Sequence, residues 1–154
     1  MDKDTRSQFW KALEHSPYMM VRLEGTNSHA EPMTAQLDRD AHHAIWFYCA
    51  RSNRVAQGGR AMAQYASKGH DVFACIAGTL TEETDRAIFD KHWSNPVEAW
   101  FAGGKDDPDV MILRFDIDDA EVWVADLGMT GKFKLLTGSQ IRSEEAGKHA
   151  VGLV

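Results

Sequence analysis

The sequence predicts a mainly β protein, an antiparallel barrel interrupted by a few helical excursions. About six segments with strand character follow one another in near-meander order, and helical segments are few. No GxGxxG follows a strand and no GxxxxGKS or GxxxxGKT occurs, so a doubly wound nucleotide-binding sheet lacks support. The length fits a single domain over residues 1–154, and 44% hydrophobic residues suffice for a packed core.

The N-terminal segment predicts a helix over Arg6–His15. Thr5 and Gln8 have the spacing of a capping box, and apolar residues follow at helical spacing. Pro17 then ends the helix, because a proline disfavours helical geometry in the residue before it.

Three meandering strands are predicted next. Residues Tyr18–Glu24 alternate between apolar and polar, and a turn cluster follows at 25–28. The extended pattern resumes over Glu31–Leu37 and, after a polar turn at 38–40, becomes a dense aromatic run at Ala44–Cys49. Because that run has no polar alternation, we expect it to be buried on both faces.

The middle of the chain predicts a helix, a strand and a second helix. Apolar residues between Val55 and Tyr65 suit a helix, although the pair Gly58-Gly59 indicates a break or close packing there. Residues His70–Leu80 have strand character. At 81–85 a hydroxyl and several acids are suited to cap a helix that begins there.

The C-terminal part predicts a short helical turn, two strands and a tail. The turn begins at Asn95-Pro96 and continues to Phe101, and a loop rich in glycine and aspartate follows. Alternating residues predict strands at Val110–Ile117 and Glu121–Ala125. Residues 129–154 form a weakly patterned tail.

Composition argues against several partners. No apolar stretch approaches the roughly 20 residues of a membrane-spanning helix, so no membrane partner is expected. The net charge is −6 and the 17 basic residues are scattered, which argues against nucleic acid. The N-terminus lacks the apolar core of a secretory signal, so we expect a cytoplasmic location. Cys49 and Cys75 lie singly in apolar runs and are predicted to be buried thiols, without a disulfide.

Motifs for metal or nucleophilic chemistry are incomplete. His29 and Glu31 match half of a zinc deaminase signature, but the two cysteine ligands of its second half are missing. The vicinal pair His42-His43 fits solvated side chains, and the acids at 106–109 do not follow a calcium-loop pattern. No nucleophile motif of a hydrolase occurs. We therefore expect no metal site and assign no catalytic residue.

One constellation favours a small-molecule site. Residues Pro32–Ala35 on one strand are expected opposite Trp46–Cys49, which lead directly into 50–54 at a predicted helix start. A helix N-terminus with a hydroxyl and flanking guanidinium groups can hold a phosphate, and the strands offer apolar surface for a flat ring. The alternative interpretation is a strand core followed by a capped, solvated helix.

The order and spacing of four segments carry a family resemblance. They are FWKALEHSPYMMVRL, HAEPMTAQLD, AIWFYCARSNRVAQ and TLTEETDRAIFDKHWSNPVEAWFAGGKDDPDVMILRFDIDDAEVW. In these segments the chain resembles the general stress protein 26 group of the pyridoxamine 5′-phosphate oxidase-like, FMN-binding split barrels. The resemblance implies a six-stranded antiparallel split β-barrel that forms a homodimer, with two FMN sites at the subunit interface.

The resemblance also implies roles for individual residues. The isoalloxazine ring of FMN would be lined by residues of two strands: Met33, Thr34, Phe47, Tyr48 and Cys49. The phosphate would be held at the helix start by Ser52 and Arg54, with Arg51 or Asn53 assisting. Three aromatic residues would lie near the pocket mouth or the partner subunit, or else pack a short helix: Trp93, Trp100 and Phe101.

Glu31 departs from the family pattern. The oxidase branch usually has an arginine at this position that reaches the flavin, whereas a carboxylate would repel an anionic phosphate. Either FMN affinity is low, or Glu31 faces away from the site. The basic residues that bind substrate in the oxidase have no clear counterpart after Gly128, so pyridoxamine phosphate oxidase activity is not predicted.

Three functions follow as expectations from the resemblance. The first is an FMN-dependent oxidoreductase with an unidentified small-molecule substrate, in which Tyr48 and His29 are candidates for substrate contacts. The second is a stress protein that binds, stores or senses flavin without turnover. The third is a dimeric scaffold that has lost flavin.

Overall fold

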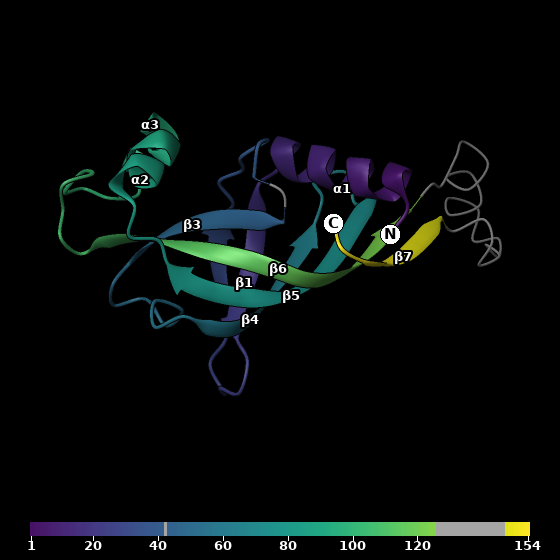
Figure 1. Cartoon of the computed structure of the whole chain (residues 1–154), viewed down its shortest axis with the longest axis horizontal. Coiled ribbons are helices and arrows are strands. Elements are labelled where there is room, and N and C mark those ends of the chain that lie inside the picture. Colours follow the sequence, from purple (N-terminus) through teal and green to yellow (C-terminus); the bar gives the residue numbers. More distant parts are fainter. Residues whose placement is uncertain (42, 126–146) are drawn as a thin grey trace.

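A computed structural model describes residues 1–41, 43–125 and 147–154 (Figure 1). Its helices and strands follow the chain in this order: α1 (Lys3–His15), β1 (Tyr18–Leu23), β2 (Glu31–Thr34), β3 (Ala44–Ala50), β4 (Gly59–Ala66), β5 (Val72–Glu82), α2 (Arg86–His92), α3 (Asn95–Glu98), β6 (Val110–Val124) and β7 (Lys148–Gly152). In the described part of the chain, no helix is long and apolar enough to cross a bilayer.

All paired strands are antiparallel and form one sheet in the order β2-β1-β4-β5-β6-β3, with β7 added alongside β6. The predicted mainly β, antiparallel fold class is therefore confirmed. The sheet coils, but strand pairing does not continue from β3 back to β2. This open seam is the architecture of a split barrel. Helix α1 lies across one end of it (Figure 1).

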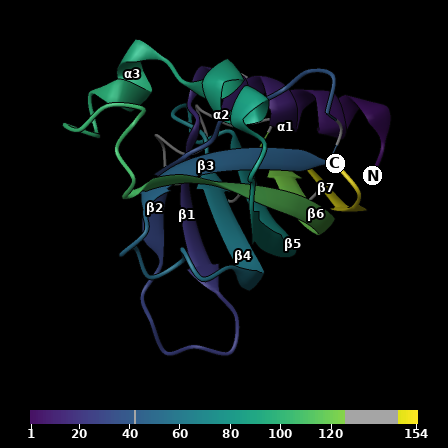
Figure 2. The ribbon, with the colours of Figure 1, turned by 60° about the vertical axis from the view of Figure 1, so that its left-hand side comes forward.

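The two edge strands of the sheet, β2 and β3, meet at a single described backbone bridge. The amide of Gln36 donates to the carbonyl of Trp46 at 2.8 Å, and the amide of Trp46 donates back at 3.0 Å. Figure 2 shows β3 crossing β2 and β1 at a steep angle, so the two edges diverge from this bridge. Pro32 is tolerated in β2 because an edge strand has amides that need no partner.

The inward face of the sheet forms the main core. Burial alternates strictly along β1, and α1 adds Phe9 and Leu13, both fully buried. Strand β3 is buried over six consecutive residues, as predicted for the aromatic run. Ile45, Phe47 and Cys49 face the main core, whereas Trp46 and Tyr48 face a second, smaller cluster beneath α2 and α3.

The predicted helix between Val55 and Tyr65 is wrong, because residues 59–66 form β4. Gly58 and Gly59 have positive φ angles of 70° and 113°, and a Cβ on Gly58 would lie 2.6 Å from the carbonyl oxygen of Leu80. Past these glycines, burial alternates with a period of two, and β4 pairs with β1 and β5. The alternation was mistaken for a helix because β4 contains several small and unbranched residues, which also favour helices.

The other predicted elements match with shifted bounds. Helix α1 begins earlier than predicted because Asp2 caps it, accepting from the amide of Thr5 at 3.0 Å. The three N-terminal strands are present, but β3 pairs with β6 and does not continue a meander from β2. Helices α2 and α3 follow Asp85 and Ser94 as N-caps. Of the predicted tail, residues 129–146 lie outside the described residues, and β7 was not predicted.

The two predicted strands at Val110–Ile117 and Glu121–Ala125 are one strand, β6, which passes through a bulge. Its pairing with β5 shifts between Ala77 and Gly78, where Asp118 is the extra residue. Gly78 lies at this point with no room for a side chain, because a Cβ would approach the carbonyl oxygen of Asp116 to 2.3 Å.

Gly78→Ala is expected to lower the free energy of unfolding by about 2–3 kcal/mol, because the methyl group would overpack the bulge. Gly25→Ala is the matched control: Gly25 has a φ of 71° and no atom within 4 Å of its Cβ position, so only backbone strain of about 1 kcal/mol is expected. Urea denaturation measures both. An equal or smaller loss for Gly78→Ala would contradict the packing described here.

Candidate functional site

A pocket of about 570 Å³ opens where β2 and β3 diverge. Its size is typical of a small-molecule site. Its walls come from β2, from the end of β3 with the following turn, from the start of β1 and from α3. The lining residues that the structure describes are uncharged: Pro17, Tyr18, Pro32, Met33, Thr34, Ala35, Gln36, Tyr48, Cys49, Ala50, Asn53, Ser94, Pro96, Val97, Trp100 and Phe101.

The β2 wall follows from strand alternation and from the bridge. Met33 is buried and Thr34 half-buried, and pairing with β1 fixes the register of both. Gln36, which makes the bridge to Trp46, also lines the pocket. The bridge therefore marks the closed end of the split.

The β3 wall carries two titratable groups that stay protonated at neutral pH. Burial raises the pKa of the Cys49 thiol to about 12. Burial also raises the pKa of the Tyr48 hydroxyl, which donates a hydrogen bond to the main-chain oxygen of Phe89. Because that hydroxyl is already engaged with α2, it serves first to anchor the helix.

Helices α2 and α3 form a cap, residues 86–98, held on the outer face of β3. The Tyr48 ring lies edge-on to both Phe89 and Trp93, with ring centroids 5.1 and 5.4 Å apart. Lys91 forms a 2.5 Å ion pair with Asp38, and this contact lowers the pKa of the Asp38 carboxyl. The cap thus fixes α3 along one side of the pocket.

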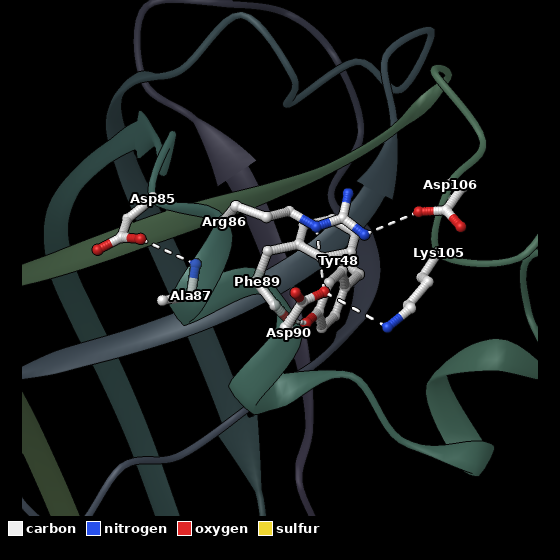
Figure 3. Close-up of polar contacts among 8 residues, drawn as sticks. All are labelled: Tyr48, Asp85, Arg86, Ala87, Phe89, Asp90, Lys105 and Asp106. Carbon is white, nitrogen blue, oxygen red and sulfur yellow. Dashed lines mark hydrogen bonds and ion pairs between the residues drawn. The ribbon is translucent and has the colours of Figure 1, made fainter.

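An ion-pair network joins α2 to the loop that follows the cap (Figure 3). Arg86 donates to Asp90 at 3.1 Å and to Asp106 at 3.0 Å, while Lys105 lies 3.8 Å from Asp90. The Arg86 guanidinium also stacks over the ring of Phe89 at 4.7 Å. These groups are exposed, so each pair contributes little alone, and the network mainly orients the loop.

Six of the ten residues predicted to bind a cofactor line the pocket: Met33, Thr34, Tyr48, Cys49, Asn53 and Trp100. Phe47 is fully buried in the main core and packs on Phe115, because its neighbours Tyr48 and Trp46 occupy the opposite face of β3. Of the three aromatic residues expected near the mouth, Trp100 and Phe101 line the pocket. Trp93 instead stacks on Phe89 within the cap.

The predicted helix start after β3 is wrong. Residues 51–57 form a run of turns, in which the Asn53 side chain accepts from the amide of Val55 at 3.0 Å. Ser52 is exposed, and Arg51 turns away from the pocket to Glu82, at 2.8 Å, and to the main-chain oxygen of Pro108. No helix N-terminus is available at this place to hold an anion.

Arg54 and Glu31 form an ion pair at the rim of the pocket. The Arg54 Nε lies 2.5 Å from a Glu31 carboxylate oxygen, and Arg54 also donates to the main-chain oxygen of His29 at 3.3 Å. Arg54 follows the lining residue Asn53, and Glu31 precedes the lining residue Pro32. Glu31 is thus turned to the arginine next to the pocket.

Several lining residues were missed from the sequence. Gln36 continues the alternation of β2, which is a usable signal. The others come from the start of β1 and from the cap, and only the fold brings them to the pocket: Pro17, Tyr18, Ser94, Pro96 and Val97.

Comparisons with known proteins agree with this geometry. Residues 4–145 match the family described as pyridoxamine 5′-phosphate oxidase like. A crystal structure of a general stress FMN/FAD binding protein from Xanthomonas citri is 41% identical, with a TM-score of 0.75, covering 83% of this chain and 94% of that one. A protein assigned as general stress protein 26 from Jannaschia sp. CCS1 is 29% identical, with a TM-score of 0.79, covering 99% and 100%. No curated protein matches the sequence.

The fold and the pocket in its split thus define a split β-barrel with a small-molecule pocket. More narrowly, the chain belongs to the pyridoxamine 5′-phosphate oxidase-like family, among its general stress protein 26 members. The resemblance seen in the four sequence segments is confirmed.

Tyr48→Phe is expected to loosen the cap, because the main-chain oxygen of Phe89 loses its hydroxyl donor. The free energy of unfolding should fall by about 1–2 kcal/mol, and amide hydrogen exchange should accelerate in α2 before the rest of the chain. Tyr18→Phe removes an exposed hydroxyl from the same pocket and should change stability by less than about 0.5 kcal/mol. Unchanged exchange in α2 of Tyr48→Phe would contradict the anchoring role.

Proposed function

We propose that this protein binds FMN in the pocket between β2 and β3. The observation that carries the proposal is the pocket's uncharged, largely apolar wall, at the place where the sequence predicts a flavin ring. The isoalloxazine ring is flat and mostly apolar, and Met33 and Thr34 on one strand with Tyr48 and Cys49 on the other would bind it. The 41% identical Xanthomonas citri protein, named for FMN/FAD binding, supports this assignment.

The two aromatic residues that follow the cap, Trp100 and Phe101, would complete the ring site. The Trp100 side chain is 76% exposed at the pocket, and an indole in that position is suited to stack on a planar ligand or to contact a second subunit. We expect its exposure to fall once flavin is bound.

We also propose that two copies of the chain form a homodimer. The sheet exposes three large apolar side chains: Met20 on β1, and Phe73 on β5, which is paired directly with Trp123 on β6. Exposed aromatic side chains on paired strands, such as Phe73 and Trp123, are typical of an interface. Light scattering should therefore give twice the 17.3 kDa chain mass, and a monomeric mass would contradict the dimer.

When bound, FMN would supply two-electron redox chemistry, and the protein would position and shield the ring. A cytoplasmic FMN-dependent oxidoreductase with a small-molecule substrate is the function we favour. The second candidate is flavin binding without turnover. It is favoured by the protonated state of Tyr48 and Cys49, because neither wall residue can act as a general base near neutral pH.

The visible absorption spectrum of the purified protein, after FMN is added and the excess removed, tests the proposed site. The wild type should retain flavin that is released intact on denaturation. Thr34→Phe should reduce retention at least about tenfold, because the added ring fills the half-buried β2 wall. Thr84→Phe makes the same change at an exposed position outside the pocket and should retain flavin normally. A wild type that stays colourless would contradict the proposal.

Reduction and reoxidation of the bound flavin distinguish the two candidates. An oxidoreductase should bleach with NADH or NADPH under anaerobic conditions and recover its colour over repeated cycles with a quinone acceptor. Bleaching by dithionite alone, with no response to either nicotinamide donor, would contradict turnover with nicotinamide and favour a binding or sensing role.

A further inference from the structure

We infer that the Glu31–Arg54 ion pair makes this site a receptor for the flavin ring rather than for its phosphate, so that riboflavin and FMN bind with similar affinity. The inference rests on the proposed flavin site and goes beyond it, because it assigns Glu31 as the residue that sets cofactor specificity.

The charge of the pocket determines what it offers to a phosphate. Among the described residues that line it there is no Lys, Arg, Asp or Glu, so this part of the wall neither attracts nor repels a phosphate. A phosphate at the pocket must therefore find its cation at the rim. Asn53 offers only an amide, whose oxygen already accepts from the amide of Val55.

The two arginines that were predicted to hold the phosphate both have carboxylate partners. Arg51 is directed away from the pocket and pairs with Glu82 at 2.8 Å. Arg54 is at the rim, but Glu31 holds its Nε at 2.5 Å and a main-chain oxygen holds one Nη. Each guanidinium thus has its own carboxylate, and neither has an unmatched positive charge.

The Glu31–Arg54 pair at the rim is partly buried. The Glu31 side chain is 22% exposed and that of Arg54 45% exposed, so this contact is less screened by water than a fully exposed ion pair. A phosphate approaching Arg54 would meet the Glu31 carboxylate at the same place and must either displace it or accept a neutralised cation. In both cases most of the attraction is lost.

The Glu31 carboxylate therefore neutralises the charge of Arg54, and removing that carboxylate should leave the positive charge free to attract a phosphate. In Glu31→Gln, the amide keeps the size of the side chain and can still accept from Arg54, but the positive charge becomes available to a phosphate. A charge-assisted contact of this kind typically changes affinity by about tenfold or more. Riboflavin lacks the phosphate and should be indifferent to the change.

Equilibrium titration of tryptophan or flavin fluorescence, with riboflavin and with FMN, gives the ratio of their dissociation constants. In the wild type the ratio should lie within about threefold of one. In Glu31→Gln it should shift by about tenfold toward FMN, and added salt should weaken that gain. Arg54→Gln should shift the ratio the other way, because Glu31 is then unpaired near the phosphate.

Glu82→Gln is the matched control, since it removes the carboxylate partner of Arg51 on the far side of the same turn. It should leave the ratio unchanged. An equal gain in Glu82→Gln would overturn the assignment to Glu31, and so would wild-type protein that binds FMN far more tightly than riboflavin with no response to Glu31→Gln. If neither flavin binds the wild type, the proposed function itself fails, and this inference fails with it.

Discussion

The backbone bridge between Gln36 and Trp46 is the constraint on which the rest of the structure depends. The sheet begins with β2 and ends with β3, and these two hydrogen bonds bring its ends together at one point. From the bridge the two edges diverge into a pocket, whose walls come from strand side chains, from the turn after β3 and from the α3 region. Position in the sheet, rather than any local motif, therefore creates the site.

The same constraint explains why β3 is apolar on both faces. One face completes the main core, and the apolar side chains of the other face, Trp46 and Tyr48, are buried beneath the cap. The cap in turn shapes the pocket, because Tyr48 anchors α2 and thereby also fixes α3 beside the pocket wall. Core packing and pocket shape are thus coupled through one strand.

Much of this could be predicted from the sequence, but with a clear physical limit. Alternation located β1 and β2, and the unbroken aromatic run identified β3 as buried on both faces. Hydrophobic periodicity alone gave the wrong prediction for β4, because two glycines with positive φ interrupt a segment rich in helix-forming residues. The orientation of Arg51 and the pairing of Arg54 with Glu31 could not be predicted, because both depend on contacts between residues far apart in sequence.

The central claim is that the split between β2 and β3 is the flavin site, and a crystal structure of the protein grown with saturating FMN tests it most directly. The account predicts density for the isoalloxazine ring between Met33 and Thr34 on one side and Tyr48 and Cys49 on the other, with Trp100 in contact. A flavin bound elsewhere on the protein, with this pocket filled only by water, would contradict it.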